Sequence, residues 1–235
     1  MKTLAIDTSL AAGSVAAADD DGVAERPLGA PGDHARLLAA ALDEVARRRG
    51  WQVRDADLVA VVRGPGSFTG LRVGVATAKA IAWATSARIV GVSGFAVVAR
   101  MTARLTDWRD APIAIPFDAG RGEVFAAVAT PAAEPGGWHV GPAVLVAAEA
   151  WIAALPAGAR VSGPALERMA AAVAARDDIV LAPTACWFPT AGEAAGLGSL
   201  CAAAGAVDDA RTLLPDYLRP SYAEERAAGP GETGR

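Results

Sequence analysis

The sequence predicts an α/β protein built from two lobes of related design. Both halves of the 235-residue chain open with strand-like segments and then alternate helical and strand-like segments. The chain is 53% hydrophobic and 20% charged, which is enough apolar surface for a sizeable core. We expect a first lobe over residues 1–107, a second over 108–223 and a disordered tail over 224–235.

The first half predicts an antiparallel meander followed by helices and strands in alternation. Residues 3–8 read as a buried strand, and two short strands flank the Asp-Gly turn at 19–22. A helix is expected over 34–49, with Asp33 as its N-cap and Gly50 placed to end it. The remaining expected elements are a strand over 56–64, a helix over 69–85, a strand over 88–93 and a helix over 94–105.

The second half repeats this pattern in an alanine-rich and less distinctive form. We expect strands over 111–118, 123–131 and 138–147, helices over 148–155 and 165–176, a strand over 179–182 and a helix over 191–204. The two lobes are expected to meet near residues 106–110.

The helix over 69–85 is apolar on nearly all sides. Only Arg72 and Lys79 interrupt it, so it is either enclosed by its own protein or lies in an interface. Gly74, Ala78 and Ala82 recur every four residues, a spacing that lets another helix approach closely.

The loop before this helix, "RGPGSFTGLR" at 63–72, matches none of the common catalytic loops. A P-loop needs a lysine after its last glycine, but Leu71 stands there; the dinucleotide fingerprint fails at Thr69. A nucleophile elbow needs glycine at the place of Pro65. The loop is interpreted as a helix entry in which Ser67 or Thr69 caps the helix, with an anion or partner contact left open. Its residues are Gly64, Pro65, Gly66, Ser67, Thr69 and Gly70.

Charge and cysteine content narrow the function classes. The net charge is −4 and the pI about 5.3, without the basic stripe by which a protein grips a polyanion alone. Cys186 and Cys201 are too far apart for a CxxC motif and read as free thiols in a reducing compartment. The sequence shows no signal peptide and no membrane span, so we expect a soluble, cytoplasmic protein.

Candidate chemical groups are few. His34 is followed one turn later by Leu38, so the His-x3-His pair of a helical zinc site is absent, and no metal is expected. Asp7 and Thr8 end the first strand. An Asp-Thr-Ser turn there places an acid near a Mg-nucleotide in actin-like phosphotransferases, but a strand-end Asp is also a common turn-maker. Both interpretations stay open.

Six segments, in order, resemble the TsaB (YeaZ) family. They are "LAIDTS" (4–9), "GDHARLL" (32–38), "VRGPGSFTGLRVGVATAKA" (62–80), "GVSGF" (91–95), "DAGRGEVF" (118–125) and "LPDYLRPSY" (214–222). The third segment is highly specific, and in the fifth Gly120 stands where the family usually has arginine. The resemblance covers residues 1–125 well and the rest loosely.

The resemblance implies an actin/hexokinase/Hsp70-like (ASKHA) two-lobed α/β fold with mixed five-stranded sheets. It also implies a non-catalytic partner subunit that binds and activates the TsaD catalytic subunit, in the complex that adds a threonylcarbamoyl group to adenosine 37 of tRNAs reading ANN codons. A TsaE-type ATPase is then reached through the complex, tRNA is contacted only indirectly, and the chain forms a homodimer when alone. The alternatives are a glycoprotease-like (M22) metalloenzyme and an ASKHA-type nucleotide-binding phosphotransferase.

In this family the first two helices form the contact surface, both in homodimers and with TsaD. The implied interface residues are Leu37, Leu38, Ala41, Leu42, Val45, Arg72, Val75, Ala78 and Lys79. Arg72 opposes the helix dipole by about 0.5 kcal/mol, which indicates a partner carboxylate or phosphate nearby. We expect no cofactor bound by this chain alone, with ATP or ADP at a subunit interface, and Asp7 and Thr8 as the nucleotide-proximal residues.

Overall fold

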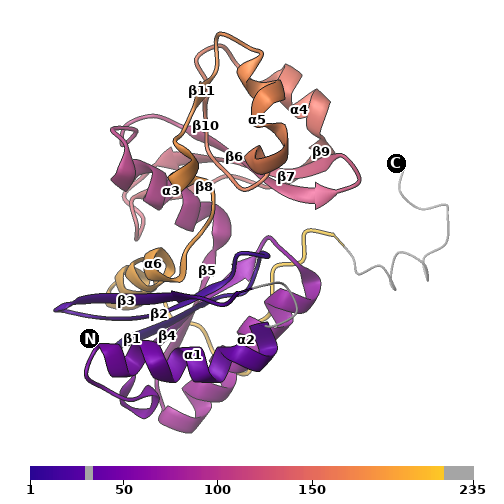
Figure 1. Cartoon of the computed structure of the whole chain (residues 1–235). Helices are drawn as coiled ribbons and strands as arrows, with labels where there is room; N and C mark the ends of the chain where they lie inside the picture. The colour runs from indigo at the N-terminus through magenta and orange to yellow at the C-terminus, as the bar shows by residue number, and fades with distance from the viewer. Residues whose placement is uncertain (30–33, 220–235) are drawn as a thin grey trace.

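Two mixed β-sheets, each covered by helices on both faces, form the two lobes (Figure 1). The computed structural model describes residues 1–29 and 34–219. The first sheet has the strand order β3-β2-β1-β4-β5, and the second has the order β11-β10-β6-β7-β8 with β9 also paired to β7. The two-lobed α/β fold is therefore confirmed, with six rather than five strands in the second sheet.

The first sheet is the predicted meander extended by two parallel strands. Strands β1, β2 and β3 pair antiparallel in succession, while β4 and β5 run parallel to β1 and to each other. Parallel neighbours need crossover connections, which the helices between them supply. The strands are β1 (Thr3–Asp7), β2 (Ser14–Asp19), β3 (Gly22–Pro27), β4 (Leu58–Gly64) and β5 (Arg88–Ser93).

Alternating side chains divide the core of the first lobe between two helical layers. Leu4 and Ile6 of β1 pack with α1 (His34–Arg48) and α2 (Phe68–Thr85) on one face. Ala5 between them packs with α6 (Ala191–Ala203) on the other. A strand buried on both faces reads as a continuous apolar run, as β1 and β4 do. A short 3₁₀ helix, η1 (Val53–Asp55), precedes β4.

The second sheet carries α3 (Gly94–Leu105) on one face and α4 (Ala148–Ala154) with α5 (Leu166–Ala174) on the other. Phe117 and Ile115 pack towards α3, and Ala114 packs towards the opposite helices. The strands are β6 (Ile113–Gly120), β7 (Glu123–Pro131), β8 (Trp138–Val140), β9 (Val144–Ala147), β10 (Arg160–Val161) and β11 (Val180–Leu181), followed by the 3₁₀ helix η2 (Thr184–Cys186).

Two helices pack on the sheet formed by the other half of the chain, and the predicted lobe boundary at residue 107 stays a prediction. Helix α3 packs mainly on the second sheet, and α6 returns to cover the first. Gly198 of α6 lies so close to the first sheet that a Cβ there would come within 2.6 Å of the Ala60 Cβ. After α6, residues 208–216 also run along the first lobe: Asp208 N donates to the Ile89 carbonyl and Asp216 N to the Arg63 carbonyl. The predicted tail, 224–235, and residues 220–223 lie outside the described residues.

The predicted end of α1 at Gly50 is confirmed. Gly50 has φ +79°, and the Trp51 N–H donates to the Ala46 carbonyl at 3.1 Å, so the chain leaves the helix at Gly50 as expected. The proposed N-cap, Asp33, lies outside the described residues.

Candidate functional site

The loop that begins α2 packs directly on the turn that follows β1. Ser67 caps α2 by accepting a hydrogen bond from the Gly70 N–H, as the sequence predicted. The Ser67 N–H donates to the Ser9 carbonyl at 2.7 Å, and the Thr8 hydroxyl donates to the Gly70 carbonyl at 2.7 Å. The two motifs, far apart in sequence, are thus fastened together at one end of the first sheet.

Two glycines make this contact possible. A Cβ at Gly70 would overlap the Thr8 carbonyl oxygen, and a Cβ at Gly66 would overlap the Ser9 carbonyl oxygen. The predicted close approach of Gly70 is therefore present, and the Thr8–Ser9 turn is its partner. Gly66 also has φ +159°, at the border of the region that side chains rarely enter.

Asp7 organises the turn from inside the protein. It is 1% exposed, and its Oδ1 accepts hydrogen bonds from the Ser9 N–H at 2.9 Å and the Ser9 hydroxyl at 2.6 Å. Burial raises the pKa of Asp7 to about 6, partly offset by the two Ser9 hydrogen bonds, and nearby Glu25 adds to the rise. The Asp7 carboxyl group stabilises the turn through Ser9, and the Thr8 hydroxyl is bonded to the Gly70 carbonyl in the first turn of α2.

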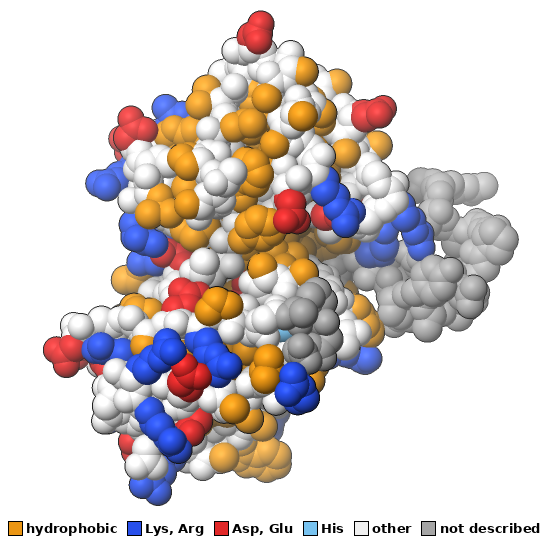
Figure 2. Space-filling model, in the orientation of Figure 1, with side chains coloured by type: hydrophobic (Ala, Val, Ile, Leu, Met, Phe, Trp, Pro, Cys, Tyr) orange, Lys and Arg blue, Asp and Glu red, His pale blue; other side chains and the backbone are white. Residues whose placement is uncertain are grey.

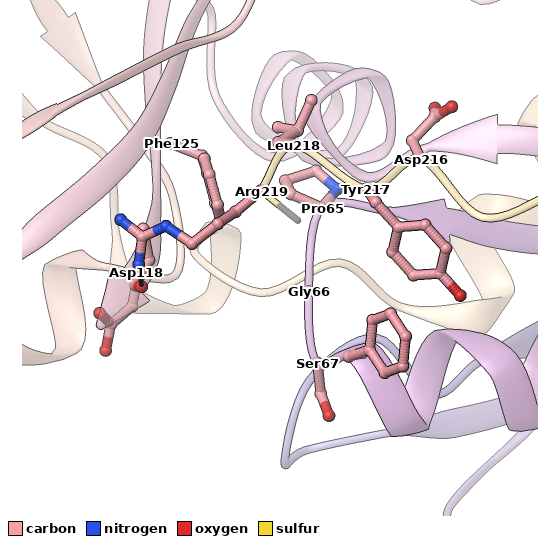
Figure 3. Close-up of a pocket in the computed structure, with 11 residues that line it drawn as sticks. Pro65, Gly66, Ser67, Asp118, Phe125, Asp216, Tyr217, Leu218 and Arg219 are labelled. Atoms are coloured by element: carbon pink, nitrogen blue, oxygen red, sulfur yellow. Dashed lines mark hydrogen bonds between the residues drawn. The ribbon is translucent and has the colours of Figure 1, made fainter. Parts of the chain in front are cut away.

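A pocket of about 310 Å³ opens where the two lobes meet, beside this loop (Figure 3). Three separate segments line it, and each belongs to one of the motifs noted in the sequence: Pro65, Gly66, Ser67 and Phe68; Asp118, Ala119 and Phe125; and Asp216, Tyr217, Leu218 and Arg219. Tyr217 stacks on Phe68 with ring centroids 4.7 Å apart. The last segment therefore bridges the lobes along one wall of the pocket.

The charged groups of the pocket are paired within the chain. Arg219 forms an ion pair with Glu123, donates to the Ala119 carbonyl at 3.0 Å and extends towards Asp118 in Figure 3. Asp118 pairs with Arg168 at 2.8 Å. Asp216 lies 3.0 Å from the Arg63 guanidinium, and burial raises the pKa of Asp216. These ion pairs hold the segment 216–219 against both lobes, and each charged side chain named here has a partner of opposite charge.

Sequence reasoning missed the bridging residues. Asp216, Tyr217 and Arg219 carry no local pattern that marks them as a site. The available signal was the family-like segment at 214–222, whose place against the α2 loop depends on long-range packing.

Six of the nine residues assigned to the partner interface are buried in the core of the first lobe itself. They are Leu38, Ala41, Leu42, Val45, Val75 and Ala78, each at most 4% exposed. Leu37 is half-buried against the same core. That the first two helices form the partner interface stays a prediction. These six side chains are nevertheless not at the surface, because the sheet-facing side of each helix packs into the core of its own lobe.

The small-residue stripe that was expected to face a partner also points inward. A Cβ at Gly74 would meet Thr8 and Ile6, and Ala78 and Ala82 are buried with it. A second stripe with the same four-residue spacing, Ala76, Ala80 and Ala84, faces outward.

The outward face of α2 is apolar. A shallow groove of about 480 Å³ runs along it, lined by Val53, Ala76, Thr77, Ala80, Ile81, Ala84 and Thr85. Beside the groove Trp83 is 89% exposed. In Figure 2, hydrophobic side chains emerge along the lower edge of the first lobe, below the basic side chains that cover α1.

The two charged residues of α2 have partners in the chain. Lys79 Nζ donates to the carbonyls of Arg211 at 3.3 Å and Leu213 at 3.1 Å, so it holds the C-terminal segment rather than standing free. Arg72 is exposed, and its guanidinium lies 4.5 Å from the Phe68 ring centroid, a cation–π distance. That contact accounts for its position near the helix start; a partner carboxylate or phosphate at Arg72 stays a prediction.

Residues 1–29 and 34–219 contain neither a metal-binding cluster nor a membrane-spanning helix. No group of three His, Cys, Asp or Glu side chains there could hold a metal ion. No helix in the same residues is long and apolar enough to cross a membrane. His34 is buried at the start of α1, and its Nε2 has no hydrogen-bond partner among the described residues.

The two layered α/β lobes have an ASKHA-type fold, which they share with solved structures. A structure from Pseudomonas aeruginosa, described as an uncharacterized protein with similarity to the peptidase YeaZ, superposes with TM-score 0.78 at 25% identity, covering 93% of this chain and 99% of that one. A second, described as YeaZ from the same organism, gives TM-score 0.77 at 23% identity, covering 92% and 99%.

The chain belongs to the family described as "TsaD: tRNA N6-adenosine threonylcarbamoyltransferase", whose model matches residues 16–217. It is 33% identical over 128 residues to the tRNA threonylcarbamoyladenosine biosynthesis protein TsaB of Escherichia coli (strain K12), and 33% identical over 126 residues to TsaB of Bacillus subtilis (strain 168). Each match covers 53% of both proteins, so the chain spans about half the length of the curated relatives it matches. It is also 44% identical over 61 residues, 26% of this chain and 17% of the other, to the tRNA N6-adenosine threonylcarbamoyltransferase of Desulfovibrio desulfuricans.

Proposed function

We propose that this chain is a non-catalytic partner subunit in tRNA threonylcarbamoyladenosine biosynthesis. It binds and activates a TsaD-type catalytic subunit, and the complex adds the threonylcarbamoyl group to adenosine 37 of tRNAs reading ANN codons. The family match and the TsaB relatives support the pathway. The observation that carries the partner role is the apolar outward face of α2.

This face is unusual for the surface of a soluble protein. Helices at a protein surface normally present polar residues outward, but the groove along α2 is lined by five Ala, Val and Ile residues and two threonines, with no charged residue among them. Trp83 at its edge has the chemistry of a binding hot spot, since tryptophan is enriched among the residues that dominate interfaces. The alanine stripe Ala76–Ala80–Ala84 lets a partner helix approach closely.

The same face serves two partners in the proposal. When alone, the chain pairs with a second copy through α2, and the catalytic subunit replaces that copy in the working complex. A TsaE-type ATPase and tRNA then engage the chain through the complex.

Two features favour a supporting role over the enzyme alternatives. His34 has Leu38 one turn on where a helical metal site would need a second ligand, and Leu38 is buried in the core. The Asp7 carboxyl, which a phosphotransferase would present to a Mg-nucleotide, is enclosed and bonded to Ser9. In the proposal ATP or ADP therefore binds only where two subunits meet.

The test is light scattering on a sizing column, with this chain mixed with the TsaD-type protein of the same genome. We expect the unmodified chain to form a heterodimer at the expense of its homodimer. Trp83→Glu is expected to weaken both associations by about thirtyfold or more, because a charge would be buried in an apolar contact.

Leu200→Glu is the matched control. Leu200 is 44% exposed and lies in the last turn of α6, as Trp83 lies in the last turn of α2. The control should keep full association. Unchanged binding by a Trp83→Glu/Ala80→Glu double variant would show that the partner uses another surface, and no complex with the unmodified chain would reject the partner role.

A further inference from the structure

The C-terminal end of α3 lies beside β8 (Figure 1). A cavity lined by arginines opens there. Its volume is about 350 Å³. It is separate from both the α2 groove and the pocket between the lobes, and no step of the proposed function uses it. The lining residues are Arg100, Ala103, Arg104, Arg109, Gly136, Gly137 and Trp138.

A buried carboxylate fixes two of the three arginines. Glu193, in the first turn of α6, is 5% exposed and forms ion pairs with Arg100 and, at 3.0 Å, with Arg104. Its own N–H donates to the Thr190 hydroxyl that caps α6. Guanidinium groups held by a rigid acceptor lose little further freedom when they bind a ligand, so the cavity is pre-organised.

The cavity keeps an excess of positive charge. Three arginines and no acidic residue are among its lining residues, while Glu193, paired with Arg100 and Arg104, compensates one charge. Arg104 and Arg109 use their Nε atoms for the bonds to Glu193 and to the Ala103 carbonyl. Both side chains are exposed, and no bond from their Nη groups to another described residue is seen. These groups are therefore available to an acceptor from outside the chain.

The opposite wall is formed by backbone and an aromatic ring. Gly136 and Gly137 have φ values of +90° and +82°, and a Cβ at Gly136 would overlap Leu197 and lie 3.7 Å from Arg100 Cδ. The turn therefore packs against Leu197 only because Gly136 lacks a side chain. The buried Trp138 also lines the cavity.

We propose that this cavity binds a phosphate group. The planar, permanently charged guanidinium matches phosphate oxygens with paired N–H donors, and a cluster of them selects phosphate over a single carboxylate. The group can be carried by a small phosphorylated molecule or by the phosphodiester backbone of an RNA; the bound chemistry is the same.

The test compares a cavity variant with a charge-matched control on the full chain. Arg104→Ala/Arg109→Ala removes two guanidinium groups from the cavity, while Arg47→Ala/Arg54→Ala removes two exposed ones from the other lobe. Inorganic tripolyphosphate is titrated by calorimetry, and a labelled RNA hairpin is titrated over a series of salt concentrations. Thermal unfolding checks that both variants fold; should the double variant unfold, Arg109→Ala replaces it.

We expect the cavity variant to bind tripolyphosphate at least about tenfold more weakly than the control, since hydrogen bonds to charged groups are lost. If RNA is the source, its affinity falls as well and its salt slope shrinks by about two, one for each lost phosphate contact. If only tripolyphosphate responds, the source is a small molecule. Equal affinities for the cavity variant and the control, or no binding of either probe to the unmodified chain, would overturn the proposal.

Discussion

The two lobes share a layered design, but a pair of glycines in one and a pair in the other are needed for different reasons. In the first lobe, Gly66 and Gly70 sit where any side chain would overlap the backbone of the Thr8–Ser9 turn. In the second, Gly120 and Gly122 have φ values of +74° and +77° with nothing within 4 Å of a Cβ. The first pair is required by a contact between distant segments, and the second only by its own backbone conformation.

The two sheets also contain strands that differ in how deeply they are buried. Every residue of β1 is buried, whereas β9 of the second sheet leaves Val144 53% exposed and Leu145 half open to solvent. In our proposal, binding by the first lobe uses the outward face of α2, the apolar face that the lobe's own packing leaves exposed. The difference gives three ways to test the comparison.

The largest effect is expected at the contact between the motifs. Gly70→Val should destabilise the protein by more than about 3 kcal/mol or prevent folding, because its side chain has no room beside the Thr8 carbonyl. Gly122→Ala in the second lobe should cost only about 1 kcal/mol, the strain of a left-handed alanine. Urea unfolding measures both, and equal losses would erase the distinction between the lobes.

The buried Asp7 should give the first lobe a characteristic pH dependence. The pKa of Asp7 is about 6 in the folded protein against an ordinary 3.8. Between these values the unfolded chain releases the proton while the folded chain keeps it. The contribution of Asp7 to the free energy of unfolding is therefore fully present below pH 3.8. It falls by up to about 3 kcal/mol as the pH rises to about 6.

Asp7→Asn keeps an acceptor for Ser9 and removes the titration. As pH rises through that window, the unfolding free energy of the wild type should fall relative to that of Asp7→Asn, and the two curves should run parallel below and above it. A constant difference between them over the whole window would contradict the burial of a titrating Asp7.

The smallest effects concern helix caps. Ser67→Ala in the first lobe should cost about 1 kcal/mol, since the Gly70 N–H loses its acceptor. Helix α4 of the second lobe starts at Ala147 without a side-chain cap, so Ala147→Ser should gain up to about 1 kcal/mol. Thermal unfolding midpoints measure both. A shift of the same sign in the two variants would show that capping does not distinguish these helices.

Local patterns predicted the elements well and their neighbours poorly. The hairpin at Asp19–Gly22, the Ser67 cap and the end of α1 at Gly50 are confirmed, because each depends on residues within one turn. The stripe that the sequence singled out in α2, Gly74, Ala78 and Ala82, faces the sheet, and the stripe Ala76, Ala80 and Ala84 faces outward. In a helix that is apolar all round, both stripes have the same spacing, and only the position of the sheet decides between them.

The return of α6 to the first lobe could not be predicted for a similar reason. An alanine-rich helix with buried residues on several sides fits either sheet, and its sequence does not say which. The bridge from Asp216 to Arg219 depends on that return, so the pocket between the lobes became visible only in three dimensions.

Hydrogen–deuterium exchange, with the chain alone and in complex with the TsaD-type protein, tests the central claim most directly. The account predicts slower exchange in peptides covering α2, residues 68–85, and no change in peptides from β8 and β9, residues 138–147. Slower exchange confined to the second lobe, with α2 unaffected, would contradict the claim that the open apolar face of the first lobe is where this protein meets its partner.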